Sequence, residues 1–212
     1  MNVFLSGGGS PDQSAALDSV FFGLLQTQSS ILYIPVALRG KRSFGECGRW
    51  FDTLLSKYGN FEYSLLDNLS KNIDELMEHQ AVFIGGGNTY ELLSEINDNK
   101  FGEFLVCFAK SGRPIYGGSA GAVVLGEHIS TVRHMDTNEC GIRSTSGVNL
   151  LDGYSVWPHY KPALDSQILR YVEETSNAVY AISEESGIHA KNTGFDVIGT
   201  VWKFDAGGKK RL

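Results

Sequence analysis

The sequence has few of the residues that stabilise small secreted or metal-binding proteins. Its 212 residues include only three cysteines, far apart and without a CxxC pair, so neither a disulfide framework nor a zinc site is expected. No apolar run approaches the ~20 residues needed to span a bilayer, and the first residues lack the basic segment of a signal peptide. We therefore expect a cytoplasmic protein with no membrane association.

Basic residues are also fewer than acidic ones. The 18 Lys and Arg against 24 Asp and Glu give a formal net charge of −6, and no basic stripe occurs. Nucleic acid is therefore not an expected partner. The sequence has no repeat, low-complexity segment or linker, and its length suits one α/β domain with a sizeable core. We expect a single domain over residues 1–212, a monomer or homodimer, with no cofactor or metal.

Apolar runs and helical patterns alternate from the first residues to about residue 127. The predicted strands are residues 3–6, 31–37, 61–66, 81–84 and the run that leads to Gly117; the predicted helices are about 13–26, 44–57, 72–79, 90–96 and 101–109. In the first helix the residues at inward spacing are Ala16, Leu17, Val20, Phe21 and Leu24. This alternation predicts an α/β fold with a parallel sheet and right-handed crossovers.

The pattern changes after residue 127. Residues 128–147 are polar and irregular, and we expect them to lie over the carboxyl edge of the sheet. A short strand at 154–157 and a helix at 163–175 follow. The last predicted strands, 179–182, 187–190, 197–201 and 202–204, are expected to be antiparallel and to close the fold.

The pattern Gly117-x-Ser119-x-Gly121 follows a short apolar run and precedes small apolar residues. A strand, a tight turn with serine at its apex and an immediate helix make a nucleophile elbow. This geometry exposes the hydroxyl of Ser119 and directs the amide of Ala120 toward an oxyanion. The alternative is a small-residue turn in which Ser119 caps the helix that follows.

A serine nucleophile needs a base, and the base needs an orienting group. His159 is the candidate base, because it ends a predicted strand where side chains face the crevice at the sheet's carboxyl edge. The remaining histidines, His79, His128, His134 and His189, are expected to be ordinary surface or strand residues. The candidate acids are Glu184, Glu185, Asp152 and Asp165, each of which could equally be solvated.

Two glycine-rich loops end predicted strands. Gly85-Gly86-Gly87 can place a backbone amide opposite that of Ala120, which would complete an oxyanion hole. Its alternative role is a tight turn in which Asn88 or Thr89 caps the next helix. The loop at residues 7–12 is only a weak signal for phosphate binding, since it lacks the third glycine of GxGxxG and a GK[ST] ending.

Four of these motifs, in order and at similar spacing, resemble the dipeptidase E (aspartyl dipeptidase) and cyanophycinase family. They are residues 83–89 (FIGGGNT), 117–122 (GGSAGA), 157–160 (WPHY) and 182–185 (ISEE). The resemblance implies a class I glutamine-amidotransferase-like, flavodoxin-like three-layer sandwich with a mostly parallel central sheet and antiparallel C-terminal strands. It also assigns Ser119 as nucleophile, His159 as base, Glu184 as acid, and Gly87 and Ala120 as oxyanion-hole amides.

The resemblance implies a serine peptidase that hydrolyses dipeptides or short peptides through an acyl-enzyme, with N-terminal Asp-Xaa among the possible substrates. The chain departs from the family pattern at one point: no arginine after His159 matches the one that reads the aspartyl side chain in family members. The chain is also short for a cyanophycinase. An esterase or acyl transferase with the same triad, and a non-catalytic flavodoxin-like binding protein, are the alternatives.

The polar segment after the elbow supplies candidates for substrate recognition. Asp136 and Glu139 could bind a free α-amino group, and Arg133 and Arg143 could bind an acidic side chain or a carboxylate. Asn88 is a further candidate beside the glycine loop. Residues in so polar a segment are individually more often solvated.

Overall fold

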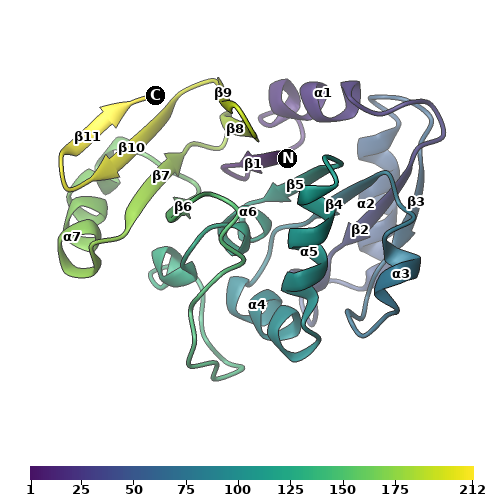
Figure 1. Ribbon diagram of the computed structural model, residues 1–212, viewed down its shortest axis with the longest axis horizontal. Coiled ribbons are helices and arrows are strands. Elements are labelled where there is room, and N and C mark those ends of the chain that lie inside the picture. The colour runs from purple at the N-terminus through teal and green to yellow at the C-terminus, as the bar shows by residue number, and fades with distance from the viewer.

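A seven-stranded sheet forms the centre of the molecule, whose computed structural model describes all 212 residues (Figure 1). Its strand order is β3-β2-β4-β5-β1-β8-β9. The five parallel strands are β1 (Asn2–Ser6), β2 (Ser30–Ile34), β3 (Glu62–Leu65), β4 (Ala81–Ile84) and β5 (Pro114–Gly118). Antiparallel β8 (Gly187–Lys191) and β9 (Gly194–Ile198) extend the sheet beyond β1. The parallel part therefore follows the predicted alternation.

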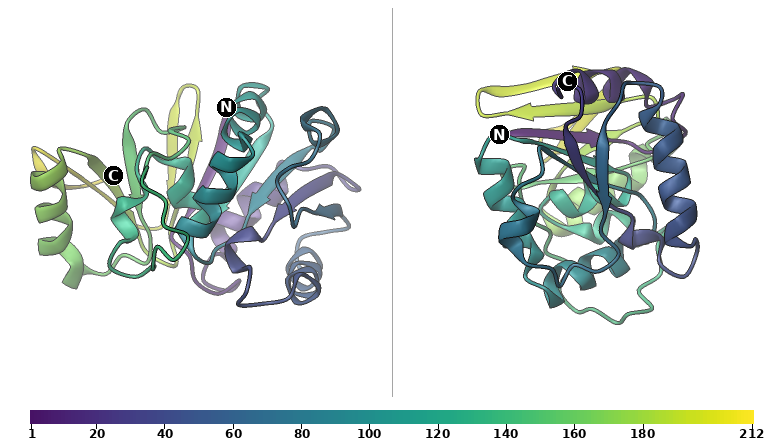
Figure 2. Two further views of the ribbon diagram at one scale, coloured as in Figure 1. Left: turned by 90° about the horizontal axis from the view of Figure 1, so that it is seen from below. Right: turned by 90° about the vertical axis from the view of Figure 1, so that its right-hand side faces the viewer.

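Helices cover both faces of this sheet (Figure 2). One layer contains α1 (Ala15–Gly23) and α2 (Phe44–Leu55), which pack on an aromatic cluster; the other contains α4 (Thr89–Asp98), α5 (Phe101–Lys110) and α6 (Ala120–Leu125). The short α3 (Ile73–Leu76) adds Leu76 to the second layer. The expected three-layer α/β architecture with a mostly parallel sheet is confirmed.

A second sheet of four strands lies beside the first and was not predicted. Its order is β11-β10-β7-β6, and its strands are β6 (Tyr154–Trp157), β7 (Ala178–Ile182), β10 (Val201–Asp205) and β11 (Gly208–Arg211). The helix α7 (Asp165–Thr175) packs on it through a separate apolar cluster. The strand at 179–182 pairs antiparallel with β10, as predicted, and it also pairs in parallel with β6.

At the C-terminal end one predicted strand boundary was wrong, and one strand was not predicted. A turn at Gly199, with φ of 78°, separates β9 from β10 inside the segment predicted as one strand. The strand β11 was missed because its residues, Gly-Lys-Lys-Arg, have no apolar alternation. Such a sequence is typical of an edge strand, where charged side chains discourage further pairing.

The first helix is rotated relative to its predicted inward face. Leu17, Asp18, Phe21 and Phe22 are buried, whereas the predicted Ala16, Val20 and Leu24 are exposed. Burial of Asp18 is tolerated because two hydroxyl groups donate to its carboxylate. The strand β2 also differs from the prediction: it ends before Pro35, because proline has no N–H to donate to the sheet, and residues 36–38 form a 3₁₀ turn.

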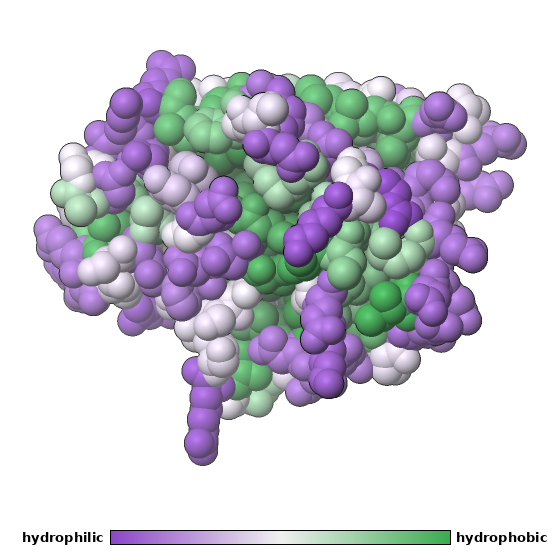
Figure 3. Space-filling view, in the orientation of Figure 1, coloured by the Kyte–Doolittle hydropathy of each residue, from purple (hydrophilic) through white to green (hydrophobic).

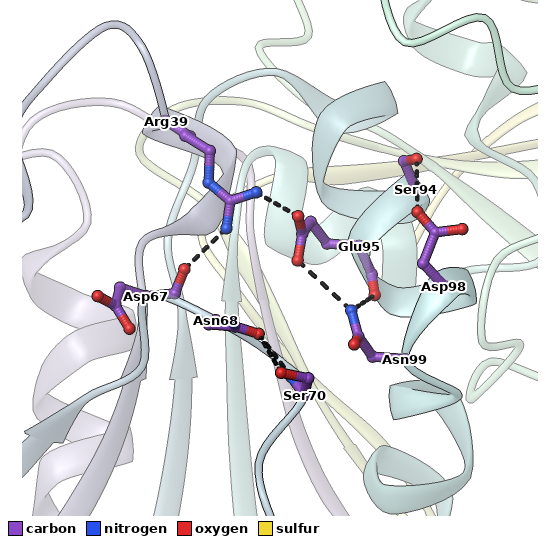
Figure 4. Close-up of polar contacts among 8 residues, drawn as sticks. All are labelled: Arg39, Asp67, Asn68, Ser70, Ser94, Glu95, Asp98 and Asn99. Atoms are coloured by element: carbon purple, nitrogen blue, oxygen red, sulfur yellow. Dashed lines mark hydrogen bonds and ion pairs between the residues drawn. The ribbon is translucent and has the colours of Figure 1, made fainter.

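Arg39 fastens the loop after β2 to α4 (Figure 4). Its guanidinium donates to Glu95 of α4 and, at 2.7 Å, to the carbonyl of Asp67. The carbonyl of Ala37 in the same loop accepts from the amide of Asn88 at 2.8 Å. These contacts brace the end of the Gly85–87 loop that follows β4.

The surface mixes charged and apolar side chains. Hydrophilic residues project over much of the face in Figure 3, and hydrophobic surface shows between them at the centre and along the upper edge. The exposed large apolar residues are Val20, Leu24, Ile73, Met135 and Phe195. None of the helices has the length and apolar character that crossing a membrane requires.

Candidate active site

Three predicted residues meet where strands of the two sheets end. Ser119 follows β5, and His159 and Glu184 each lie two residues beyond the parallel pair β6 and β7. The Oγ of Ser119 lies 2.8 Å from Nε2 of His159, and Nδ1 of His159 lies 3.0 Å from Oε1 of Glu184. Both distances are hydrogen-bond distances, so a hydroxyl, an imidazole and a carboxylate form one connected chain.

The turn at Ser119 has the strained backbone of a nucleophile elbow. Its φ of 48° and ψ of −108° lie outside the usual regions, and its side chain makes no capping hydrogen bond to α6. Gly121 is needed for close packing, because a Cβ there would lie 2.4 Å from the carbonyl oxygen of Ile84. The hydroxyl is therefore presented toward His159 and does not cap the helix.

The end of β1 and the loop after it join the two sheets at this point. The carbonyl of Ser6 accepts from the amide of Ser119 at 3.2 Å, and that of Gly7 accepts from the amide of His159 at 2.8 Å. Gly8 lies against the imidazole, since a Cβ there would be 2.3 Å from Cε1 of His159. The loop that gave a weak phosphate-binding signal thus positions the imidazole.

Glu184 is held from its other side by a residue that the sequence did not single out. Nε2 of Gln13 donates to Oε2 of Glu184 at 2.9 Å, while Oε1 of Gln13 accepts from the amide of Ser10 at 2.9 Å. The hydrogen bond from His159, followed by that from Gln13, lowers the pKa of Glu184. The only sequence signal for Gln13 was its position just after the first glycine loop.

The other candidate acids lie elsewhere. Glu185 is exposed and makes no side-chain hydrogen bond. Asp165 pairs with Lys209 at 2.6 Å, and Asp152 is exposed. Of the four carboxylates proposed from the sequence, only Glu184 contacts His159.

We expect Gln13→Ala to lower kcat by roughly 3- to 10-fold with little change in KM, because one hydrogen bond is worth about 1 kcal/mol net. Loss of the donor raises the pKa of Glu184 toward its usual value, so this carboxylate should protonate, and lose its hydrogen bond from His159, at a higher pH. Steady-state kinetics across pH checks both effects. Gln26→Ala, at an exposed position, should change neither, and an unchanged profile for Gln13→Ala would contradict a positioning role.

Two backbone amides near Ser119 are free to bind an anion. The amide of Gly87 makes no hydrogen bond within the protein, and that of Ala120, the first residue of α6, has no acceptor within its helix. The adjacent Gly86 lies against Ser119, with a Cβ there 3.3 Å from the Cβ of Ser119. Gly87 directly follows Gly86 and Ala120 directly follows Ser119, so the two predicted amides belong to the residues next to this contact.

A cavity of about 350 Å³ opens beside Ser119 on the face that α1 and α2 cover. Its floor is the stacked pair Phe83 and Tyr116, with ring centroids 4.4 Å apart. Alternate residues of a strand share a face, so Gly85 and Gly118 leave space above these rings. Further walls are formed by Asp18, Trp50, Leu54, Val132, Met135 and Asp136.

The predicted substrate-binding residues are divided between this cavity and other places. Asp136 lines the cavity, and its Oδ2 accepts from the amide of Thr89 at 2.9 Å. Asn88 does not line it, because its side chain caps α4 and donates to the carbonyl of Thr137. Arg133 lies over the ring of Tyr171 in a different hollow, and Glu139 is exposed away from the cavity.

The remaining histidines lie outside the cavity. His189 is buried in β8 and stacks on Phe4, and the exposed His134 stacks on Trp157. No group of three or more His, Cys, Asp or Glu side chains is arranged to hold a metal ion.

Comparison with known proteins identifies the family to which this chain is related. The family model described as peptidase family S51 matches residues 3–198. An uncharacterized peptidase of Pasteurella multocida is 30% identical over 152 residues, 66% of this chain and 69% of that protein. Peptidase E of Streptomyces coelicolor is 31% identical over 147 residues, 68% of this chain and 56% of that protein.

Solved structures share the fold at lower sequence identity. A candidate peptidase E protein from Listeria monocytogenes EGD-e has a TM-score of 0.74 at 22% identity, covering 100% of this chain and 98% of that one. A peptidase from an acI-B1 Actinobacterium has a TM-score of 0.69 at 18% identity, covering 100% and 96%. Since the family model spans almost the whole sequence, the chain belongs to peptidase family S51 and is a serine peptidase.

Proposed function

We propose that this peptidase hydrolyses dipeptides or short peptides, with Ser119 as nucleophile, His159 as general base and Glu184 as the acid that orients it. The observation that carries the proposal is the chain of hydrogen bonds, 2.8 Å and 3.0 Å long, that ends at the cavity. Such a chain activates a hydroxyl that is otherwise a weak nucleophile.

In the first half-reaction, Oγ of Ser119 bonds to the carbonyl carbon as its proton passes to Nε2 of His159. The amides of Gly87 and Ala120 donate to the resulting oxyanion, each worth roughly 3 kcal/mol of transition-state stabilisation. His159 then protonates the leaving amine, the C–N bond breaks, and an acyl-enzyme remains on Ser119.

In the second half-reaction, water gives a proton to His159 and attacks the acyl carbon. The tetrahedral intermediate collapses, and Oγ of Ser119 regains its proton from His159. Throughout, Glu184 accepts the hydrogen bond from Nδ1 and stabilises the imidazolium. Because the pKa of Glu184 is lowered, its carboxylate stays ionised at pH values where an ordinary glutamate would begin to bind a proton.

A free α-amino group at the substrate's N-terminus needs a negative partner, and Asp136 is the predicted partner that lines the cavity. We expect Asp136→Asn to raise KM for unblocked dipeptides by about 10-fold, as expected for a lost charge-assisted hydrogen bond. Asparagine keeps an acceptor for the amide of Thr89, so the start of α4 should stay intact. N-acetylated dipeptides lack the ammonium group, and an equal KM change for them would show that Asp136 does not read it.

A dipeptide library assayed with wild type beside Ser119→Ala tests the proposed function. We expect hydrolysis by wild type and its loss in the variant. Turnover of activated esters without any dipeptide would support an esterase or acyl transferase, and ligand binding without turnover of either would support a binding protein.

A further inference from the structure

Asp18 is a buried carboxylate in the wall of the catalytic cavity that the proposed mechanism does not use. It lies on α1 with only 1% of its surface exposed. Its Oδ1 accepts from the hydroxyl of Tyr116 at 2.6 Å, and its Oδ2 accepts from the hydroxyl of Ser14 at 2.8 Å. These two hydrogen bonds satisfy part of the acceptor capacity of the carboxylate. Hydroxyl groups are neutral, so the negative charge of Asp18 stays uncompensated.

No cation lines the same cavity. Its lining includes the carboxylates of Asp18 and Asp136 and no lysine or arginine. Lys57, whose charge lowers the pKa of Asp18, is itself paired with Asp12 at 2.8 Å. Arg42 lines a separate hollow of about 220 Å³. Burial is the largest influence on Asp18, and the net effect raises its pKa.

The remaining surface around Asp18 suits a long side chain. Phe83 and Tyr116 form a flat aromatic floor, and Trp50 and Leu54 of α2 form an apolar wall. Aromatic rings accommodate the methylene stem of a lysine and attract a cation at its end. In so enclosed a place, charges interact more strongly than in water, and a substrate carboxylate would be repelled.

We propose that Asp18 determines specificity: the cavity accepts an N-terminal residue with a neutral or, preferably, cationic side chain and rejects an acidic one. This inference rests on the proposed dipeptidase function. The negative field of Asp18 acts on whatever side chain enters the cavity, and no lysine or arginine in the lining offsets it. Asp18 is thus assigned a role in substrate selection and none in the chemistry at Ser119.

Isosteric pairs of dipeptides isolate the effect of charge from that of shape. For wild type at about pH 8, well above the usual pKa of a carboxyl group, kcat/KM should be at least ~100-fold higher for Gln-Ala than for Glu-Ala. Lys-Ala should exceed norleucyl-Ala by roughly 10-fold. Asp18→Asn should shrink each ratio by about 10-fold. Asp74→Asn, the same change at an exposed site on α3, should leave both ratios unchanged.

Two further measurements separate failure of this inference from failure of the proposed function. Calorimetric titration of Ser119→Ala with the same four dipeptides reports binding without turnover, and Ser119→Ala/Asp18→Asn repeats it. If the dipeptides bind with the expected charge preference but wild type does not hydrolyse them, the proposed dipeptidase function is contradicted and the role of Asp18 in binding is supported. Hydrolysis with no Gln-over-Glu preference, or with a preference that survives Asp18→Asn, would overturn the role of Asp18.

Folding of the variant is checked by its melting temperature. Because the pKa of Asp18 is raised in the folded state, its ionisation costs stability as pH rises through the interval between its unfolded and folded pKa values. Removal of the charge should therefore not lower the melting temperature at neutral pH. A structural defect would lower it and slow all four substrates equally, which would contradict a role in selection.

Discussion

Ser119→Ala or His159→Ala should lower kcat for dipeptide hydrolysis by at least ~10³-fold, and the double variant should be little worse than either. In the proposed mechanism Ser119 and His159 act as one unit, and a 2.8 Å hydrogen bond joins them. Without the imidazole the hydroxyl keeps its proton, and without the hydroxyl the imidazole has nothing to activate. Steady-state kinetics of the three variants measures the coupling.

Exposed residues of the same type provide controls for these substitutions. His134→Ala removes an exposed histidine that lies outside the cavity, and Ser19→Ala removes an exposed serine on α1. Both should keep kcat within about 2-fold of wild type. Losses that add in the double variant would mean that Ser119 and His159 contribute separately, against a shared mechanism.

Gly8→Ala should lower kcat by at least ~10²-fold, because a methyl group there would displace the imidazole of His159. The new Cβ would lie 2.3 Å from Cε1 of that ring. Gly112 provides a matched control: it also has positive φ, 84° against 96° for Gly8, but a Cβ there meets nothing within 4 Å. Both substitutions strain the backbone by about 1–2 kcal/mol, and only Gly8→Ala should affect catalysis.

Unfolding in denaturant distinguishes backbone strain at Gly8 from a steric clash between the new methyl group and His159. Gly8→Ala should destabilise wild type more than Gly112→Ala does, and this excess should disappear in a His159→Ala background, where the ring is absent. An activity loss for Gly112→Ala as large as that for Gly8→Ala would show that general destabilisation of the fold, and not displacement of His159, is responsible.

The parallel part of the fold could be predicted because its signals are local. Buried strands such as 81–84 are continuous apolar runs, and the elbow at Gly117–Gly121 has a pattern that few other structures require. The position of Asp136 beside the cavity could also be anticipated, because the polar segment leaves the elbow helix near the site. The roles of Ser119, His159 and Glu184 stay predictions that rest on resemblance and geometry.

What could not be predicted depends on contacts between distant segments. The second sheet is specified by pairing of β7 with β6 and β10, which single-strand patterns do not reveal. The inward face of α1 includes Asp18 because Tyr116, nearly a hundred residues away, donates to it. The positions of Gln13 and Gly8 beside the site could not be predicted from the sequence either, because they depend on contacts with Glu184 and His159, which are distant in the chain.

The most direct test of the central claim is mass spectrometry of the protein after treatment with a fluorophosphonate, which labels only activated serines. The wild-type chain should gain one adduct, located by peptide mapping on Ser119, and His159→Ala should gain none. Absence of an adduct on the wild-type chain, or an adduct on a different serine, would contradict the account of Ser119 as the activated nucleophile.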